Sequence, residues 1–353
     1  MSLHLISADD AMARYDSFDT VIDARSEGEH AEDHLPGALN WPSLNNEERV
    51  RVGTLYKQVN PFEAQKIGAA LVAANIARHI QAHVQDKGRQ WQPLIYCWRG
   101  GKRSNSLAHI LSQIGFKVHL IEGGYKAFRK AVVEDTPRRV QALQFRVLCG
   151  PTGSGKTRLL QALAAQGAQV LDLEALASHR ASVLGVIPGQ PQPTQKAFET
   201  RLWDQLRRFS PTRTVFVEAE SKKVGNLTVP GSLMEAMRAS ACVRLELPLA
   251  ARVQLLMEDY DYFVRDAAFF GERLDRLADL KGRAVVDDWK QRAQAGHTAE
   301  VVAELLERHY DPGYESSTSR NFQQYAQAER LALSGPGAPE MALGASQLLA
   351  AAR

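Results

Sequence analysis

The sequence predicts two α/β domains, each built on a mostly parallel sheet. The chain has 353 residues, and a domain takes roughly 100–200 residues. Short apolar strands alternate with helical segments on both sides of the charged stretch 130–140, a pattern typical of parallel α/β folds. In each half, one strand leads into a glycine-rich turn and a helix. We expect a first domain at 1–137, a second at 138–330 with added helices, and a weakly structured or helical tail at 331–353.

The first half contains short apolar segments that predict strands, separated by segments with helical periodicity. The expected strands are Thr20–Asp23, Pro93–Cys97 and Val118–Ile121, and the expected helices lie at 63–84 and 104–114. The stretch 130–140 is charged, contains Pro137 and lacks apolar periodicity. We therefore expect it to be a linker.

Apolar segments in the second half predict the strands of another sheet. They are Phe145–Cys149, Gln169–Leu173, Thr214–Glu218 and Cys242–Leu247. Residues 251–310 are expected to be mostly helical. The aromatic residues at 260–270 are expected to lie in the core, or to line an apolar pocket for a lipid tail.

Composition excludes several classes of protein. With 44% hydrophobic residues, the chain is neither disordered nor of low complexity. The sequence has no run of about 18 apolar residues, so we expect no membrane helix. Met1–His4 does not resemble the start of a signal peptide. Three scattered cysteines are too few for a disulfide framework. We expect a cytoplasmic protein without a membrane partner and favour a monomer.

The net charge of +3 hides an uneven distribution of charge. Residues 138–260 carry 16 basic and 10 acidic residues, whereas 1–137 carry 16 of each. A basic region with nearby aromatic residues suits a phosphate backbone and stacked bases. Arg201 and Arg208 are seven residues apart, so we expect them to share a helix face that binds nucleic acid. A solvated helix surface above core aromatic residues is the alternative interpretation.

Cys97 ends an apolar strand and precedes a charged, glycine-rich turn, Trp98-Arg99-Gly100-Gly101-Lys102-Arg103-Ser104. A strand–turn–helix of this kind points backbone N–H groups and the positive end of the helix at one place. The two glycines allow a tight turn, and Arg99, Lys102 and Arg103 add positive charge. These features stabilise a thiolate, or an anion attached to its sulfur. A persulfide, a perselenide and a phosphocysteine would all benefit.

The other two cysteines differ from Cys97. Cys149 and Cys242 lie inside apolar strands and are expected to be small core residues.

A second glycine-rich turn, Gly150-Pro151-Thr152-Gly153-Ser154-Gly155-Lys156-Thr157, matches the phosphate-binding pattern Gly-x4-Gly-Lys-[Ser/Thr]. It lies between an apolar strand and a helix, as that motif requires. Its backbone N–H groups would hold a diphosphate, Lys156 would neutralise the outer phosphate, and Thr157 would bind a Mg²⁺ ion. Nothing in the loop demands a nucleotide, and the base-recognition tetrapeptide Asn-Lys-x-Asp is absent.

A carboxylate at a neighbouring strand end is expected beside this metal ion. Glu218 is the best candidate, and Asp172 and Glu174 follow at the end of another strand. The alternative for each residue is a solvated carboxylate at a strand end.

Two segments that flank the cysteine loop resemble signatures of the rhodanese family. They are Asp23-Ala24-Arg25 with His34-Leu35-Pro36-Gly37-Ala38-Leu39-Asn40, and the later Gly123-Gly124-Tyr125. Cysteine phosphatases share the pattern Cys-x5-Arg-Ser, which Cys97 to Ser104 also fits, but these flanking segments favour the rhodanese family. The resemblance implies that Cys97 carries a transferable chalcogen atom and that Asp23, Arg25 and His34 support the active face structurally.

The chain contains, in this order, a rhodanese-like domain, a phosphate loop and the segment His179-Arg180-Ala181-Ser182. This combination resembles the tRNA 2-selenouridine synthase family. That family usually has His-Arg-Gly-Ser at the third site, where this chain has Ala181. The resemblance implies action on the wobble 2-thiouridine of the tRNAs for Lys, Glu and Gln. It implies S-geranylation with geranyl diphosphate, followed by exchange for selenium donated by selenophosphate, which a partner enzyme supplies.

The resemblance also implies a division of roles between the two loops. The phosphate loop, Lys156 and a Mg²⁺ ion would hold the diphosphate leaving group of the prenyl donor. Cys97 would accept selenium as a perselenide, stabilised by Arg99, Lys102 and Arg103. The remaining residues expected to bind substrate are Trp98, Gly100, Gly101, His179, Arg180, Arg201 and Arg208.

Three other functions fit parts of the sequence. One is an ATP-dependent tRNA sulfurtransferase, in which the phosphate loop hydrolyses ATP. Another is a P-loop kinase regulated by an inactive rhodanese module, which the intact cysteine loop disfavours. The third is a cysteine phosphatase, which the rhodanese-like flanking segments disfavour.

Overall fold

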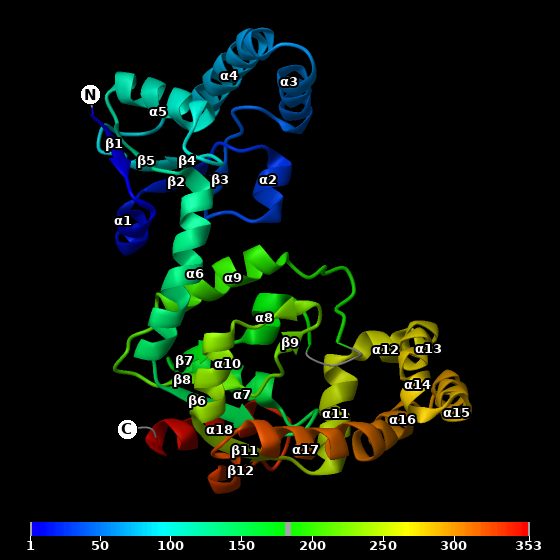
Figure 1. Ribbon diagram of the computed structural model, residues 1–353. Helices are drawn as coiled ribbons and strands as arrows, with labels where there is room; N and C mark the ends of the chain where they lie inside the picture. The colour runs from blue at the N-terminus through cyan, green and yellow to red at the C-terminus, as the bar shows by residue number, and fades with distance from the viewer. Residues whose placement is uncertain (1, 181–184, 352–353) are drawn as a thin grey trace. The chain divides into compact units, whose positions relative to one another are not determined.

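The computed structural model describes residues 2–180 and 185–351 and contains two compact units (Figure 1). The first unit comprises Met1–Thr136 and Pro193–Asp204, and the second comprises Pro137–Gln192 and Gln205–Arg353. Each unit is an α/β fold on a parallel sheet, as the sequence predicts. The sequence places 193–204 in the second domain, whereas in the structure this segment packs with the first unit.

The first unit is built on a five-stranded parallel sheet. Its strands are β1 (Ser2–Ile6), β2 (Thr20–Asp23), β3 (Leu39–Asn40), β4 (Pro93–Tyr96) and β5 (Lys117–Ile121). They lie in the order β1-β5-β4-β2-β3. The central strand, β4, is buried at every residue, because parallel sheets are covered on both faces and their strands are continuously apolar.

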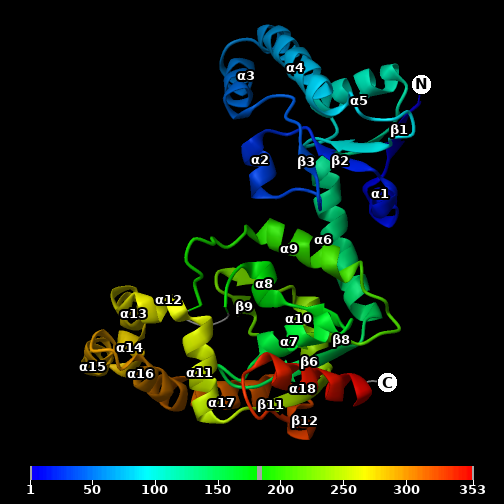
Figure 2. The same ribbon diagram turned by 180° about the vertical axis from the view of Figure 1, so that it is seen from behind.

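Helices cover the two faces of this sheet (Figures 1 and 2). They are α1 (Ala8–Ala13), η1 (Tyr15–Ser17), α2 (Glu27–Glu32), α3 (Asn46–Gln58), α4 (Pro61–His83), α5 (Lys102–Ile114) and α6 (Gly124–Ala142). Neighbouring strand residues point to opposite faces: Leu94 joins one apolar cluster with Phe128 of α6, and Ile95 joins another with Leu107 of α5. The cysteine loop lies between β4 and α5.

The prediction of a linker at 130–140 is wrong, because helix α6 continues through these residues. Phe128, Val132 and Val140 are buried and provide the helical spacing of apolar residues that the charged residues obscure in the sequence. Pro137 lies inside the helix. The structure therefore joins the two units by a continuous helix.

Helix α9 (Gln195–Leu206) supplies part of the core of the first unit. The side chain of Trp203 is fully buried there, makes edge contacts with Tyr15 and Phe128, and donates a 2.9 Å hydrogen bond to Asp135. Thr200 donates to the buried Asp33 at 2.9 Å. These contacts explain why 193–204 belongs to this unit.

The second unit contains another five-stranded parallel sheet, in the order β12-β11-β6-β8-β7. The strands are β6 (Phe145–Cys149), β7 (Gln169–Leu171), β8 (Val215–Glu218), β11 (Ala241–Glu246) and β12 (Glu329–Ala332), and a small ribbon joins β9 (Lys223–Val224) to β10 (Leu227–Thr228). The four strands expected from the sequence are present. The phosphate loop follows β6, the central strand.

The helices of this unit are α7 (Lys156–Ala165), α8 (Leu173–Ala177), α10 (Gly231–Ala239), α11 (Leu249–Asp259), α12 (Asp261–Arg265), α13 (Ala267–Leu274), η2 (Asp275–Leu277), α14 (Ala278–Lys281), α15 (Arg283–Gln294), α16 (Thr298–Leu305), the π-turn η3 (Leu306–Tyr310), α17 (Asp311–Asn321), η4 (Tyr325–Gln327) and α18 (Ala338–Ala351). The segment from α12 to η3 has its own apolar core around Phe270 and Trp289. We call this segment the helical lobe. It confirms the helical prediction for 251–310.

The tail at 331–353 is more ordered than its composition indicates. Strand β12 pairs with β11 along Val243↔Glu329 to Glu246↔Ala332. Helix α18 packs on α7, with Met341, Ala345 and Leu348 buried. Of the two expectations for the tail, the helical one holds for 338–351, and the strand was not expected.

No helix in the described ranges is both long and apolar enough to cross a membrane.

Candidate functional site

The first candidate site is the cysteine loop. Cys97 directly follows β4 and its side chain is buried. The backbone N–H of Gly101 donates to Sγ at 3.2 Å, and the hydroxyl of Ser104 donates to it at 3.0 Å. Two donors on one sulfur, at the beginning of α5, stabilise negative charge on that atom. The loop therefore directs one backbone and one side-chain hydrogen-bond donor at the sulfur of Cys97.

Two glycines make the close packing of this loop possible. Gly100 has a φ of +66° and Gly124 a φ of +58°, values that favour glycine. A Cβ at Gly124 would lie 2.2 Å from the carbonyl oxygen of Cys97 and 2.6 Å from the nitrogen of Gly100. The next residue, Tyr125, donates its N–H to that same Cys97 carbonyl at 2.8 Å. The segment at Gly124 thus packs against the backbone of the cysteine loop and supports it.

The three cations of the loop lie in different environments. Arg99 and Lys102 are exposed. Arg103 instead forms an ion pair with Glu29 of α2, at 2.6 Å. Burial raises the pKa of Glu29, but the hydrogen bond and charge of Arg103, together with the N–H of Ser26 and the charge of Arg49, lower it below its usual value. An anion bound at this loop would therefore lie near two exposed cations, Arg99 and Lys102, and near Arg103, which is paired with a carboxylate.

The rhodanese-like flanking residues form a buried polar network. Asp23 and Arg25 are almost completely buried and pair at 2.7 Å. Arg25 also donates to the carbonyl of Asp33 at 2.6 Å and lies 4.0 Å from the ring of Tyr125. His34 bonds to the carbonyl of His30 at 2.9 Å. These contacts hold β2, α2 and α6 together, in agreement with a supporting role. Trp98 stacks on Tyr125 at 5.4 Å.

The second candidate site is the phosphate loop between β6 and α7. Gly153 and Gly155 have φ values of +78° and +86°. Lys156 turns back over the loop and donates to the carbonyl of Gly150 at 2.7 Å. The hydroxyl of Ser154 is buried without a hydrogen-bond partner among the described residues. This loop has the shape and the unused donor expected of a site for a diphosphate.

Thr157 and three carboxylates form a candidate metal site beside the loop. The Thr157 hydroxyl donates to Glu174 and to Glu218, both at 3.3 Å. Glu220 completes a group whose ligand atoms lie within 4.8 Å of one another. Burial, followed by repulsion from Glu174, raises the pKa of Glu218 well above its usual value. Oxygen ligands of this kind suit Mg²⁺.

The residues present fit a divalent cation. Glu218 keeps one buried oxygen without a hydrogen-bond partner in the described part of the chain, and a cation would relieve the repulsion among the carboxylates. The sequence pattern does not predict Glu220, because this residue lies two positions beyond the end of β8. Asp172 is not part of this group, and its side chain accepts from the N–H of Ala175 and caps α8.

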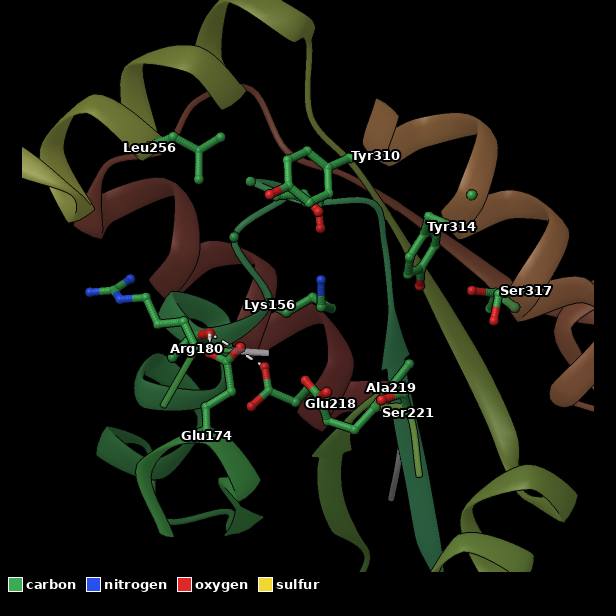
Figure 3. Close-up of a pocket in the computed structure, with 18 of the residues that line it drawn as sticks. Lys156, Glu174, Arg180, Glu218, Ala219, Ser221, Leu256, Tyr310, Tyr314 and Ser317 are labelled. Atoms are coloured by element: carbon green, nitrogen blue, oxygen red, sulfur yellow. Dashed lines mark hydrogen bonds between the residues drawn. The ribbon is translucent and has the colours of Figure 1, made fainter. Parts of the chain in front are cut away.

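A cavity of about 420 Å³ opens above the loop and the carboxylates. Lys156 lies near its centre, with Glu174 and Glu218 on one side and Leu256 and Tyr310 on the other (Figure 3). Tyr314 of α17 accepts the N–H of Gly150 at 2.5 Å. The cavity therefore combines a charged wall with an aromatic and apolar wall.

The chain has recognisable relatives. Two family models match it: the tRNA 2-selenouridine synthase AAA domain at residues 143–269 and the rhodanese-like domain at residues 7–131. The tRNA 2-selenouridine synthase of Marinobacter nauticus is 31% identical over 346 residues, which cover 90% of this chain and 91% of the relative. The chain belongs to this family.

The chain is also similar to two further proteins. The tRNA 2-selenouridine synthase of Nitrosomonas europaea is 37% identical over 266 residues, which cover 72% of this chain and 67% of the relative. Among solved structures, a rhodanese-related protein from Thermoplasma volcanium is 17% identical, with a TM-score of 0.25. The matched region covers 36% of this chain and 92% of the chain of that protein.

The third motif of this tRNA 2-selenouridine synthase family lies partly at the cavity. Arg180 lines the cavity, lies 4.6 Å from the ring of Tyr260 and pairs with Asp259 at 3.6 Å. His179 is buried, and its Nδ1 has no hydrogen-bond partner among the described residues. Ala181 and Ser182 lie outside the described residues. The structure thus brings Arg180 to the phosphate site.

The expectation that Arg201 and Arg208 share a helix face is wrong. Arg201 is exposed on α9, but α9 ends at Leu206. The N–H of Arg208 then bonds to the carbonyl of Gln205 in a turn, and the two arginines belong to different units. Cys149 and Cys242 are buried core residues, as the sequence predicts.

Proposed function

We propose that this chain converts wobble 2-thiouridine of the tRNAs for Lys, Glu and Gln to 2-selenouridine in two steps. The first is S-geranylation with geranyl diphosphate at the phosphate loop, and the second is selenation from selenophosphate at Cys97. The observation that carries the proposal is the presence on one chain of a cysteine whose sulfur accepts two hydrogen bonds and of a phosphate loop beside three carboxylates. Relatives named tRNA 2-selenouridine synthase support it.

In the geranylation step, the 2-thio sulfur forms a bond to C1 of the geranyl group. The C1–O bond breaks, and its electron pair leaves on the diphosphate. The N–H groups of the phosphate loop, Lys156 and Arg180 would stabilise this departing charge. A Mg²⁺ ion held by Thr157, Glu174, Glu218 and Glu220 would supply further positive charge at the diphosphate.

In the selenation step, the geranylated sulfur is the leaving group at C2 of the base. Geranylation turns a poor leaving group, a thiocarbonyl sulfur, into a thiolate that can depart. The exposed Arg99 and Lys102 of the cysteine loop would bind selenophosphate, while Gly101 and Ser104 donate hydrogen bonds to the sulfur of Cys97.

The electron balance differs between two roles for Cys97, one as a carrier of selenium and one as an acceptor of the phosphoryl group. A perselenide forms only if the thiolate attacks selenium and phosphorus leaves as phosphite, and a thiol must later reduce the S–Se bond. Alternatively, selenophosphate displaces the geranyl thiolate at C2, and Cys97 then attacks phosphorus. That step breaks the Se–P bond, leaves 2-selenouridine and forms a phosphocysteine, which water hydrolyses to orthophosphate.

The second role needs no reductant, so we expect orthophosphate as the phosphorus product. Phosphorus nuclear magnetic resonance of the completed reaction checks this expectation. Phosphite would instead support the perselenide.

The basic residues of 138–260 are proposed to contact tRNA, whose phosphates they would neutralise. We also propose a transient partner, the enzyme that supplies selenophosphate, because a labile selenium donor is best handed over directly. Both proposals rest on the two-step reaction.

Single substitutions at the two sites test the division of the reaction. Cys97→Ala is expected to abolish 2-selenouridine, at least 100-fold, while S-geranylated tRNA accumulates. Lys156→Ala is expected to lower geranylation at least 10-fold, because the departing diphosphate loses its nearest cation. Mass spectrometry of tRNA nucleosides measures both products, and Cys242→Ala serves as the control. Equal loss of both products in the Cys97→Ala protein would contradict the division.

A further inference from the structure

Helix α9 brings a threonine hydroxyl to a buried carboxylate of the first unit. Thr200 donates to the side chain of Asp33 at 2.9 Å, and both residues are almost completely buried. The same carboxylate oxygen of Asp33 accepts the hydroxyl of Tyr125 at 2.8 Å. Tyr125 lies at the beginning of α6, and α9 runs beside this helix (Figures 1 and 2). Asp33 therefore links α9 to Tyr125.

The hydroxyl of Thr200 also accepts a hydrogen bond from a cation. Arg129 of α6 donates to it at 3.0 Å, pairs with Glu199 at 2.5 Å and lies 3.8 Å from the carboxylate of Asp33. The hydroxyl thus donates to one charged group and accepts from another. Hydrogen bonds to charged groups are the strong ones, and a buried charge that loses a partner is costly. Removing this hydroxyl would leave both Arg129 and Asp33 short of one hydrogen bond.

Tyr125 continues this network to the cysteine loop. Its backbone N–H donates to the carbonyl of Cys97 at 2.8 Å, and its ring stacks on Trp98 at a centroid distance of 5.4 Å. The next residue, Lys126, donates its N–H to the carbonyl of Trp98 at 3.1 Å. Tyr125 is therefore held at its hydroxyl by Asp33 and at its backbone by the cysteine loop. Its position determines where the backbone of Cys97 and Trp98 lies.

The docking of α9 on the first unit does not depend on Thr200 alone. Phe198 and Trp203 are fully buried, and Lys196 pairs with Glu32 at 2.6 Å. These contacts fasten the helix on both sides of Thr200. A buried polar network that is fully satisfied fixes one arrangement of its members. The contact of Thr200 with Asp33 therefore contributes precision at Tyr125 more than it contributes attachment of the helix.

We propose that Thr200 is a positioning residue for the cysteine loop and acts through Asp33 and Tyr125. The proposal rests on the proposed function, in which Cys97 serves the selenation step. Thr200 holds the carboxylate that holds Tyr125, and Tyr125 keeps the backbone of Cys97 where its sulfur receives two hydrogen bonds. A residue from the second half of the sequence thereby completes the selenation site.

Hydrogen exchange of the full-length protein, followed by mass spectrometry of its peptides, tests the positioning directly. Thr200→Val keeps the branched shape of threonine and removes the hydroxyl. Peptides that contain the backbone N–H groups of Gly101 and Tyr125 are expected to exchange at least 10-fold faster in this variant. Strand β5, in the same sheet, is expected to exchange at the wild-type rate. Thr200→Ser keeps the hydroxyl and is expected to restore the wild-type rate in both peptides.

Thr136→Val is the matched control. Thr136 is also a buried threonine, but its hydroxyl donates to the carbonyl of Val132 within α6, at 2.7 Å. This variant is expected to leave the exchange of the cysteine loop unchanged. Unchanged exchange of the loop in the Thr200→Val protein overturns the proposal. It is also overturned if β5 exchanges faster to the same extent, or if Thr136→Val has the same effect on the loop, because either result indicates general loosening of the unit.

Selenation of geranylated RNA gives a second measurement. Thr200→Val is expected to lower kcat at least 10-fold and to leave the KM for selenophosphate within about 2-fold, because the exposed Arg99 and Lys102 remain. Thr200→Ser is expected to recover kcat to within about 3-fold of wild type. An unchanged kcat, or a change in KM alone, overturns the positioning role. If the wild-type protein forms no 2-selenouridine, the proposed function fails, and the exchange rates still decide whether Thr200 positions the loop.

Discussion

At the scale of single residues, the two sites depend on close approach of backbone to backbone. Cys97 is held by one amide and one hydroxyl donor, and its carbonyl is held by Tyr125. Lys156 is held against the carbonyl of Gly150. Glycine is required wherever a Cβ would occupy the space that these contacts use. The glycines that matter are therefore those that carry both a positive φ and a close neighbour.

Gly124→Ala is expected to stop selenation, because its Cβ would lie 2.2 Å from the carbonyl of Cys97 and would displace the cysteine loop. We expect at least a 100-fold loss of 2-selenouridine, with geranylated tRNA still formed in the second unit. Gly115→Ala is the matched control. Gly115 also has a positive φ, +115°, but nothing lies within 4 Å of its Cβ position, so it adds strain of about 1 kcal/mol without a clash. Both products are measured by nucleoside mass spectrometry. Equal selenation by the two variants would contradict this account of the loop.

At the scale of helices and strands, long-range pairing determines what local patterns leave open. Strand β1 has exposed side chains at three of its five residues, yet it pairs with β5 along its whole length. Helix α18 packs on α7 through the buried side chains of Met341, Ala345 and Leu348. Such elements are stabilised by their neighbours, and their own sequences carry a weak signal.

His119, on β5, gives this sheet a pH dependence. It packs between His4 and Phe18, and its Nε2 is buried without a hydrogen-bond partner among the described residues. Burial lowers the pKa of His119 from 6.5 to about 4. The neutral ring therefore stabilises the fold fully above pH 6.5, and this contribution is lost as the pH falls from 6.5 to 4.

We expect the free energy of unfolding to decrease by roughly 1–3 kcal/mol across that interval because of His119 alone. His119→Phe removes the titrating group and should flatten this part of the profile. Urea unfolding between pH 4 and pH 7 measures the effect. His109→Phe, at an exposed position of α5, should keep the wild-type profile. An equal slope in the wild-type and His119→Phe proteins would assign the pH dependence to other groups.

At the scale of the whole molecule, the two candidate sites lie in separate units, and each unit contributes its own loop after a central strand. The boundary between the units, at Thr136 and Pro137, falls within helix α6. The segment 193–204 comes from within the sequence of the second half and completes the core of the first unit through Trp203. The first unit is therefore not made from one continuous stretch of chain.

Local sequence determined the parts of this protein that depend on neighbouring residues. The two parallel sheets, most strand positions, the cysteine loop, the phosphate loop and Glu218 were all predicted, because strand–turn–helix motifs have short-range glycine, cation and apolar patterns. The rhodanese-like flanking residues were predicted as supports, and their buried ion pair agrees with that role.

Only the tertiary structure decided the features that join distant segments. Four features depend on contacts remote in sequence or on where a helix ends. They are the pairing of Arg103 with Glu29, the third carboxylate Glu220, the separation of Arg201 from Arg208 and the transfer of 193–204 to the first unit. The small apolar pocket around Met257, Phe263 and Val302 is the same kind of feature, because its walls come from five helical segments. The sequence offers a pocket among the aromatic residues at 260–270 only as an alternative to a core, and it does not show which other segments would line it. Packing free energy brings those segments together, and it depends on the whole fold rather than on any local pattern.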